Sequence, residues 1–164
     1  SPSSPTQPSS TSSQSQPPPT VPAALAGITN WNLTQRFGSV SGPDNCWVRG
    51  QRQTWSPAVF PGIPMKVTQS AGSIKLESSY FVTDYTGTFV GSEFSSTGDD
   101  PLEASLYVTP CPEGPVAQLA GTSALSGYFS ADGRLLTATE VNTYPLASGE
   151  TVTYRWEWQA TRLN

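Results

Sequence analysis

The final segment of the chain, residues 151–162, alternates between apolar and polar side chains without a break. One set of alternate positions is apolar or aromatic and comprises Val152, Tyr154, Trp156, Trp158 and Ala160. The other set is polar or charged and comprises Thr153, Arg155, Glu157, Gln159 and Thr161. Because successive side chains of a β-strand point to opposite faces, this period of two predicts a strand with one dry face and one solvated face.

Segments rich in Thr, Val and aromatic residues recur along the chain and are separated by turn residues. The predicted strands cover residues 30–40, 46–55, 64–70, 73–82, 85–95, 102–109, 122–130, 134–144 and 151–162. We therefore predict an all-β fold, an antiparallel up-and-down barrel of about eight strands, with a β-sandwich as the alternative. Closure favours the barrel because it leaves no exposed strand edge.

The first hairpin whose register can be argued turns at Ala71-Gly72. A two-residue loop there places Val67 opposite Leu76 on one face. The same register places Lys66 opposite Glu77 on the other face, so that opposite charges meet.

The second such hairpin joins residues 134–144 to residues 151–162. Pairing Tyr144 with Thr151 places Glu140 across from Arg155, and this predicts a cross-strand ion pair on the solvated face. In that register Glu140 and Glu157 share the outer face of the barrel. A third turn is predicted at Ala131-Asp132-Gly133, since Asp-Gly is a strong turn signal.

The N-terminal segment, residues 1–20, contains eight Ser, six Pro, three Thr and three Gln and no apolar or charged side chain. Such a composition buries too little apolar surface to offset the entropy of ordering. We therefore predict a disordered linker over residues 1–20, followed by one β-domain over residues 21–164.

The sequence has two cysteines, Cys46 and Cys111, which lack the C-x-x-C spacing of a redox or zinc motif. In an exported protein, a disulfide between them is favoured over two free thiols.

Composition excludes several classes of function. The sequence has no histidine, which excludes Ser-His-Asp and Cys-His catalysis and His-ligated metal sites. The formal charge is −4, from 8 basic and 12 acidic residues, which argues against a nucleic-acid binder. No apolar run is long enough for a membrane-spanning helix. We expect a non-enzymatic monomer without cofactor, metal site or nucleic-acid partner.

The start of the β-domain, with Gly27 and Trp31 in the run 25–34, resembles the first strand of calycin-type barrels, the lipocalin and avidin-like group. Residues 67–74 and 130–135 resemble two hairpins of secreted bacterial lipoproteins of similar build. The resemblance implies that Trp31 packs beneath Arg162 of the last strand, in a stacking or cation–π contact.

The Ser/Pro/Thr-rich tail resembles the start of a mature bacterial lipoprotein, in which a lipidated cysteine would precede Ser1. An interdomain linker of a longer secreted protein is the alternative. The resemblance implies a domain that is secreted or tethered to the bacterial cell envelope.

Three functions remain open at this stage. The first is a lipocalin-like barrel that holds a small, largely apolar ligand, with the candidate residues Tyr154, Trp156, Trp158, Trp31 and Phe129. The second is a carbohydrate-binding module that presents Trp47 and Trp55 to a glycan. The third is a structural envelope protein without a ligand, in which the aromatic row of residues 151–162 only fills the barrel.

Overall fold

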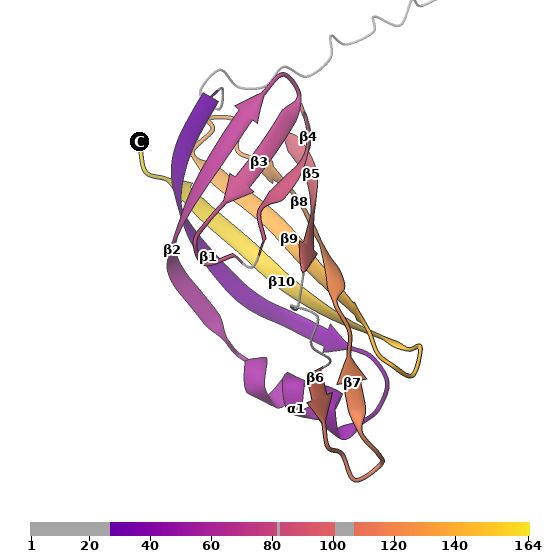
Figure 1. Ribbon diagram of the computed structural model, residues 1–164. Helices are drawn as coiled ribbons and strands as arrows, with labels where there is room; N and C mark the ends of the chain where they lie inside the picture. Colours follow the sequence, from indigo (N-terminus) through magenta and orange to yellow (C-terminus); the bar gives the residue numbers. More distant parts are fainter. Residues whose placement is uncertain (1–26, 82, 101–106) are drawn as a thin grey trace, which may run out of the picture.

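A computed structural model of the chain describes residues 27–81, 83–100 and 107–164 (Figure 1). The predicted linker, residues 1–20, lies outside the described residues. The elements within the described ranges are β1 (Gly27–Ser41), α1 (Cys46–Trp55), β2 (Val59–Ser70), β3 (Ser73–Glu77), β4 (Tyr85–Val90), β5 (Glu93–Asp100), β6 (Tyr107–Thr109), β7 (Val116–Gln118), β8 (Gly121–Phe129), β9 (Leu135–Pro145) and β10 (Thr151–Arg162).

Eight strands form a closed antiparallel barrel in the order β1-β10-β9-β8-β5-β4-β3-β2. The first strand closes it, because β1 pairs with both β10 and β2. The pairing of β1 shifts register between Leu33 and Gln35 on one side and between Phe37 and Ser39 on the other. Such irregularities bend a strand and help a sheet to curl. The predicted all-β barrel is confirmed, and the β-sandwich alternative is wrong.

The predicted strand over residues 46–55 is wrong, since these residues form α1 (Figure 1). The Asn45 side chain caps the helix by accepting a 2.9 Å hydrogen bond from the Val48 N–H. Trp47 and Val48 are buried, so the helix packs one side against the barrel. The β-favouring Trp47, Val48 and Trp55 suggested a strand, but the cap and tertiary packing outweigh propensity.

Several other predicted strands differ in their bounds. The strand predicted over residues 64–70 begins earlier, at Val59, and the strand predicted over residues 73–82 ends at Glu77. Residues 85–95 were predicted as one strand, whereas β4 and β5 are two strands joined by a tight turn in which Gly91 has φ +65°. Of the predicted strand 102–109, residues 107–109 form β6, which pairs with β7 in a small separate sheet. Residues 102–106 lie outside the described residues.

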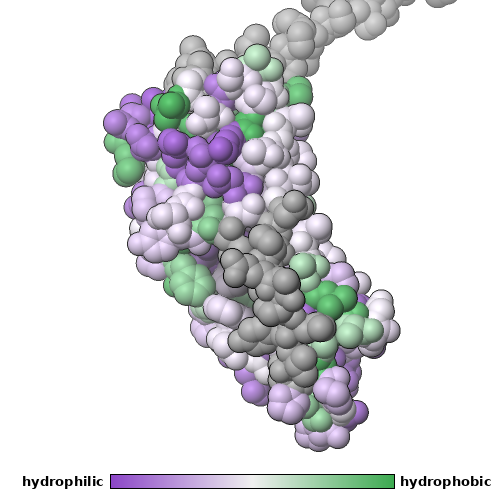
Figure 2. Space-filling model, viewed as in Figure 1, coloured by the Kyte–Doolittle hydropathy of each residue, from purple (hydrophilic) through white to green (hydrophobic). Residues whose placement is uncertain are grey.

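The β2–β3 hairpin has the predicted register, with Val67 opposite Leu76 and Lys66 opposite Glu77. Ala71 and Gly72 both have positive φ, as the two central residues of a type I′ hairpin turn require. The Lys66 ammonium lies 3.1 Å from the Glu77 carboxylate. In Figure 2, strongly hydrophilic residues gather over β2 and β3, so the outer wall is charged there.

The predicted register of β9 and β10 is wrong by one residue. Glu140 pairs with Trp156, and Arg155 pairs with Val141. Because a slip of one residue moves a side chain to the opposite face, Glu140 points into the barrel instead of meeting Arg155 in solvent. Glu140 is buried and Glu157 is exposed, so the two carboxylates do not share a face.

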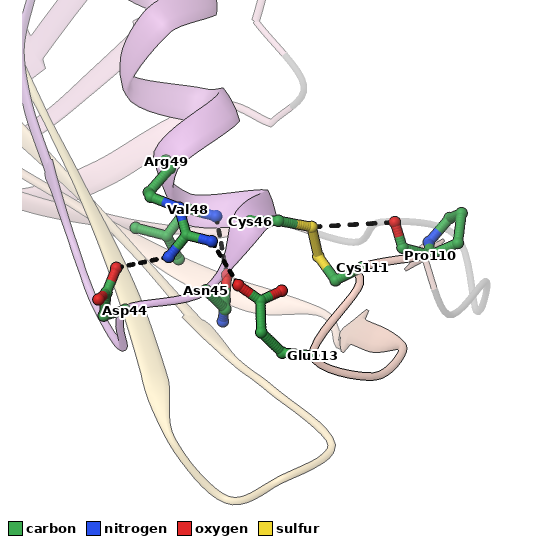
Figure 3. The surroundings of a disulfide bond; sticks show 8 residues. All are labelled: Asp44, Asn45, Cys46, Val48, Arg49, Pro110, Cys111 and Glu113. Atoms are coloured by element: carbon green, nitrogen blue, oxygen red, sulfur yellow. Dashed lines mark hydrogen bonds and ion pairs between the residues drawn. A yellow bond between two sulfur atoms is a disulfide. The ribbon is translucent and has the colours of Figure 1, made fainter.

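The predicted disulfide is present, because Cys46 at the start of α1 is bonded to Cys111, between β6 and β7 (Figure 3). Beside it, Arg49 donates hydrogen bonds to Asp44, at 2.7 Å, and to Glu113. The bond from Arg49 lowers the pKa of the Glu113 carboxyl below its ordinary value. The disulfide and Arg49 therefore attach the β6–β7 hairpin to the helix.

The two ends of the barrel differ in what they carry. The start of β1 and the C-terminus lie at one end, and α1 with the β6–β7 hairpin lies at the other (Figure 1). In the described ranges, the 10-residue α1 is the one helix, and it is too short and too polar to cross a membrane.

We predict that replacing Cys46 and Cys111 together by Ser lowers the free energy of unfolding by about 4 kcal/mol. The reason is that the disulfide closes a loop with a sequence separation of 65 residues and thereby restricts the unfolded chain. Guanidinium denaturation of the variant and the oxidised parent measures the difference. The reduced parent serves as control and should match the variant; equal midpoints for the variant and the oxidised parent would contradict the prediction.

Candidate ligand cavity

The end of the barrel away from α1 is solidly filled by aromatic rings. Phe129 is at the centre, with ring centroids 5.4 Å from Trp31 and 5.5 Å from both Phe89 and Phe94. All four side chains are buried. Trp31 and Phe129, two of the candidate ligand residues, are therefore part of this packing and line neither of the cavities described below.

The last strand places Arg162 directly across from Trp31. The stacking or cation–π contact that the resemblance implies between them stays a prediction. The indole of Trp31 is fully buried, and its Nε1–H donates a 2.8 Å hydrogen bond to Thr29 Oγ1. This pair of strands closes the barrel at its filled end.

At the other end, residues of α1 and β10 line a cavity of about 360 Å³ that is open to solvent. It brings together Tyr154 and Trp156 from the apolar-ligand hypothesis with Trp47 and Trp55 from the glycan hypothesis. Its lining residues are Trp47, Gln51, Trp55, Gln118, Asn142, Tyr144, Tyr154 and Trp156. Trp47 and Trp55 lie at this cavity because residues 46–55 form a helix instead of the predicted strand.

Trp156 is the centre of an aromatic cluster beside the cavity. Its ring centroid lies 5.4 Å from Phe37, 5.7 Å from Trp55 and 5.9 Å from Phe60. The first two contacts are edge-to-face, a favourable geometry for aromatic pairs. Trp156 is only partly buried, so it retains surface on which a ligand can pack.

Gln51 holds two of the rings in place. Its Oε1 accepts a 2.9 Å hydrogen bond from Trp55 Nε1–H and another of 2.9 Å from the Tyr154 hydroxyl. Burial raises the pKa of Tyr154 well above its ordinary value, so the phenol stays protonated and remains a donor.

A second cavity of about 240 Å³ lies further into the barrel and shares Trp55, Asn142, Tyr144 and Trp156 with the first. Glu140 and Trp158 also line it. The ring centroid of Trp158 lies 5.2 Å from that of Phe81 and 5.7 Å from that of Tyr85. The second cavity therefore lies between the filled core and the helix end.

Glu140 is the centre of a buried hydrogen-bond network in this cavity wall. Its Oε1 accepts from the Tyr85 hydroxyl at 2.9 Å and from Asn142 Nδ2 at 2.8 Å. Its Oε2 accepts from Trp158 Nε1–H at 2.7 Å. Asn142 Nδ2 also donates to Ser123 Oγ at 2.6 Å. The carboxylate thus orients polar groups from three strands, β4, β9 and β10.

Glu140, Asn142 and Gln51 were not predicted as site residues. A signal for the first two was present, because Leu136, Ala138, Glu140 and Asn142 follow a period of two that continues an apolar row. The adjacent Leu135 obscured it, since either leucine could start the inward row. Nothing in the sequence of residues 46–55 predicts a contact between Gln51 and Tyr154, because these two residues are 103 positions apart.

We predict that Glu140→Ala lowers the free energy of unfolding by about 1–3 kcal/mol, because it leaves buried donors without an acceptor. The matched control is Glu157→Ala on the exposed face of β10, which should change it by less than about 0.5 kcal/mol. Urea denaturation measures both. Equal effects of the two substitutions would show that the network around Glu140 does not stabilise the fold.

No protein-family model and no curated protein matches the chain. A search of solved structures finds a mutant of transferrin binding protein B from Haemophilus parasuis, with 11% sequence identity and a TM-score of 0.44. The match covers 85% of this chain and 27% of that chain, so this chain corresponds to only a part of the larger protein's length.

Proposed function

We propose that the chain is a non-enzymatic, extracytoplasmic binding domain that holds a small, largely apolar ligand at the helix end of its barrel. The observation that carries this proposal is the contrast between the two ends. Inside the barrel, one end is packed with rings around Phe129, whereas the other keeps two adjoining cavities that Trp55 and Trp156 both line.

The size and lining of the cavities support a small ligand. Pockets for small molecules are mostly apolar, carry a few polar groups and have volumes of about 300–1,000 Å³. The outer cavity, at about 360 Å³, falls within this range. Its walls combine indole and phenol rings with the amides of Gln51, Gln118 and Asn142.

The extracytoplasmic location is supported by the disulfide. A bond between Cys46 and Cys111 persists in oxidising compartments and is rare in the cytosol. The Ser/Pro-rich residues 1–20 suit a spacer between such a domain and the surface or partner domain that carries it. The composition of this tail favours a domain that is secreted or tethered to a bacterial envelope, with a lipid anchor upstream of Ser1.

The glycan alternative fits the observed geometry less well. Rings that bind the surface of a polysaccharide need an exposed face, but Trp47 is buried and Trp55 is half-buried. A structural role without any ligand is the outcome expected if the cavities bind no probe.

The proposal predicts that Trp156→Ala weakens binding of N-phenyl-1-naphthylamine, a neutral apolar fluorophore, at least about tenfold, or 1.4 kcal/mol. The ring lines both cavities, so its removal takes away contacts with a ligand in either. Probe fluorescence on titration gives the affinity, and circular dichroism verifies the fold.

Tyr128→Ala is the matched control, because this aromatic side chain is 54% exposed on the outer wall. It should bind the probe as the parent does. Equal affinity of Trp156→Ala and the parent, or absence of probe binding to the parent, would refute the cavity as a ligand site.

A further inference from the structure

Glu140 is an acidic side chain in an interior that is otherwise neutral. Among the described residues, the buried polar side chains besides Glu140 are Thr29, Gln69, Ser96, Gln118, Ser123 and Asn142. None of these carries a charge. Burying a carboxylate is costly unless it is paired and hydrogen-bonded, so its partners show what compensates it.

The partners of Glu140 are all neutral donors. They are the phenol of Tyr85, the amide of Asn142 and the indole of Trp158. In the described ranges, the ion pairs involve Arg49, Lys66 and Lys75, none with Glu140, and no Lys or Arg lines either cavity. The negative charge therefore has no cation from the described part of the chain.

The carboxylate also has spare acceptor capacity. An ionised carboxylate offers about four lone-pair sites. Oε1 receives two donors and Oε2 receives one. Because Glu140 lines the inner cavity, a ligand N–H group there can take the remaining site on Oε2.

The walls around Glu140 suit a positive charge as well. Trp156, Trp158, Phe81 and Tyr85 line the same cavity. Aromatic faces attract an ammonium within about 6 Å of the ring centroid, more strongly when water is excluded. A carboxylate beside several rings is the combination that recognises an organic ammonium ion.

The geometry points to an organic cation as the ligand: an ammonium group on Glu140 with an apolar body extending towards Trp55 and Trp156. This inference rests on the proposed function and names the ligand class of the same cavity. The ammonium supplies the positive partner that the Glu140 carboxylate lacks, and the apolar body occupies the space towards α1.

Three compounds of similar shape and different charge test it on the full chain at pH 7: 2-phenylethylamine, 2-phenylethanol and 3-phenylpropionate. Each displaces N-phenyl-1-naphthylamine in a competition titration. We expect the amine to bind at least about tenfold more tightly than the alcohol, equivalent to 1.4 kcal/mol. The carboxylate should bind most weakly, because it meets a like charge.

Glu140→Gln assigns the preference to this residue, since it removes the charge and nearly keeps the shape. The amine and the alcohol should then bind within about twofold of each other, that is, less than 0.5 kcal/mol apart. Glu157→Gln, on the exposed face of β10, is the control and should keep the parent's preference. If Glu140→Gln does not fold, the ranking of the three compounds on the parent decides.

The outcomes separate the two proposals. If the probe binds but the alcohol displaces it as well as the amine does, or no compound displaces it, the cation inference is wrong and the cavity stands. An amine preference that survives Glu140→Gln also overturns the assignment. If the probe does not bind the parent, both the cavity and its ligand class are refuted.

Discussion

The interior of this barrel depends on how β9 pairs with β10. The pairing of Glu140 with Trp156 places both side chains on the inner wall, since residues directly opposite in a sheet share a face. A pairing shifted by one residue would exchange the inner row of β9 for Leu135, Val141 and their alternates, and the carboxylate would be in water. The register therefore decides whether the cavity is charged.

The two ends of the barrel interior differ in how many of their aromatic rings carry polar atoms. At the filled end, phenylalanines without polar atoms pack around Phe129. Towards α1, most rings that line the cavities are tryptophan and tyrosine, whose N–H and O–H groups need partners when buried. Gln51 supplies one acceptor and Glu140 another. Rings held by hydrogen bonds to Gln51 and Glu140 cannot easily shift to fill the space beside them, so these hydrogen bonds and the cavities occur together.

Much of the fold could be predicted because local patterns determine it. The dry face of residues 151–162, the Ala71-Gly72 turn and the β2–β3 register follow from period and turn chemistry alone. The site could not, for two physical reasons. Leu135 and Leu136 leave the phase of β9 ambiguous, and the attraction between Glu140 and Arg155 favoured the wrong choice. In addition, the Asn45 cap turned residues 46–55 into a helix, and this brought Trp47 and Trp55 to Trp156.

The arrangement of the chain ends has a consequence for any attached form of the protein. Residues 1–26 join the barrel at Gly27, which lies with the C-terminus at the end remote from α1 (Figure 1). A domain held through its N-terminal segment is thus held from its filled side. The helix and both cavities lie at the opposite end from this point of attachment, so attachment and access do not compete for the same surface.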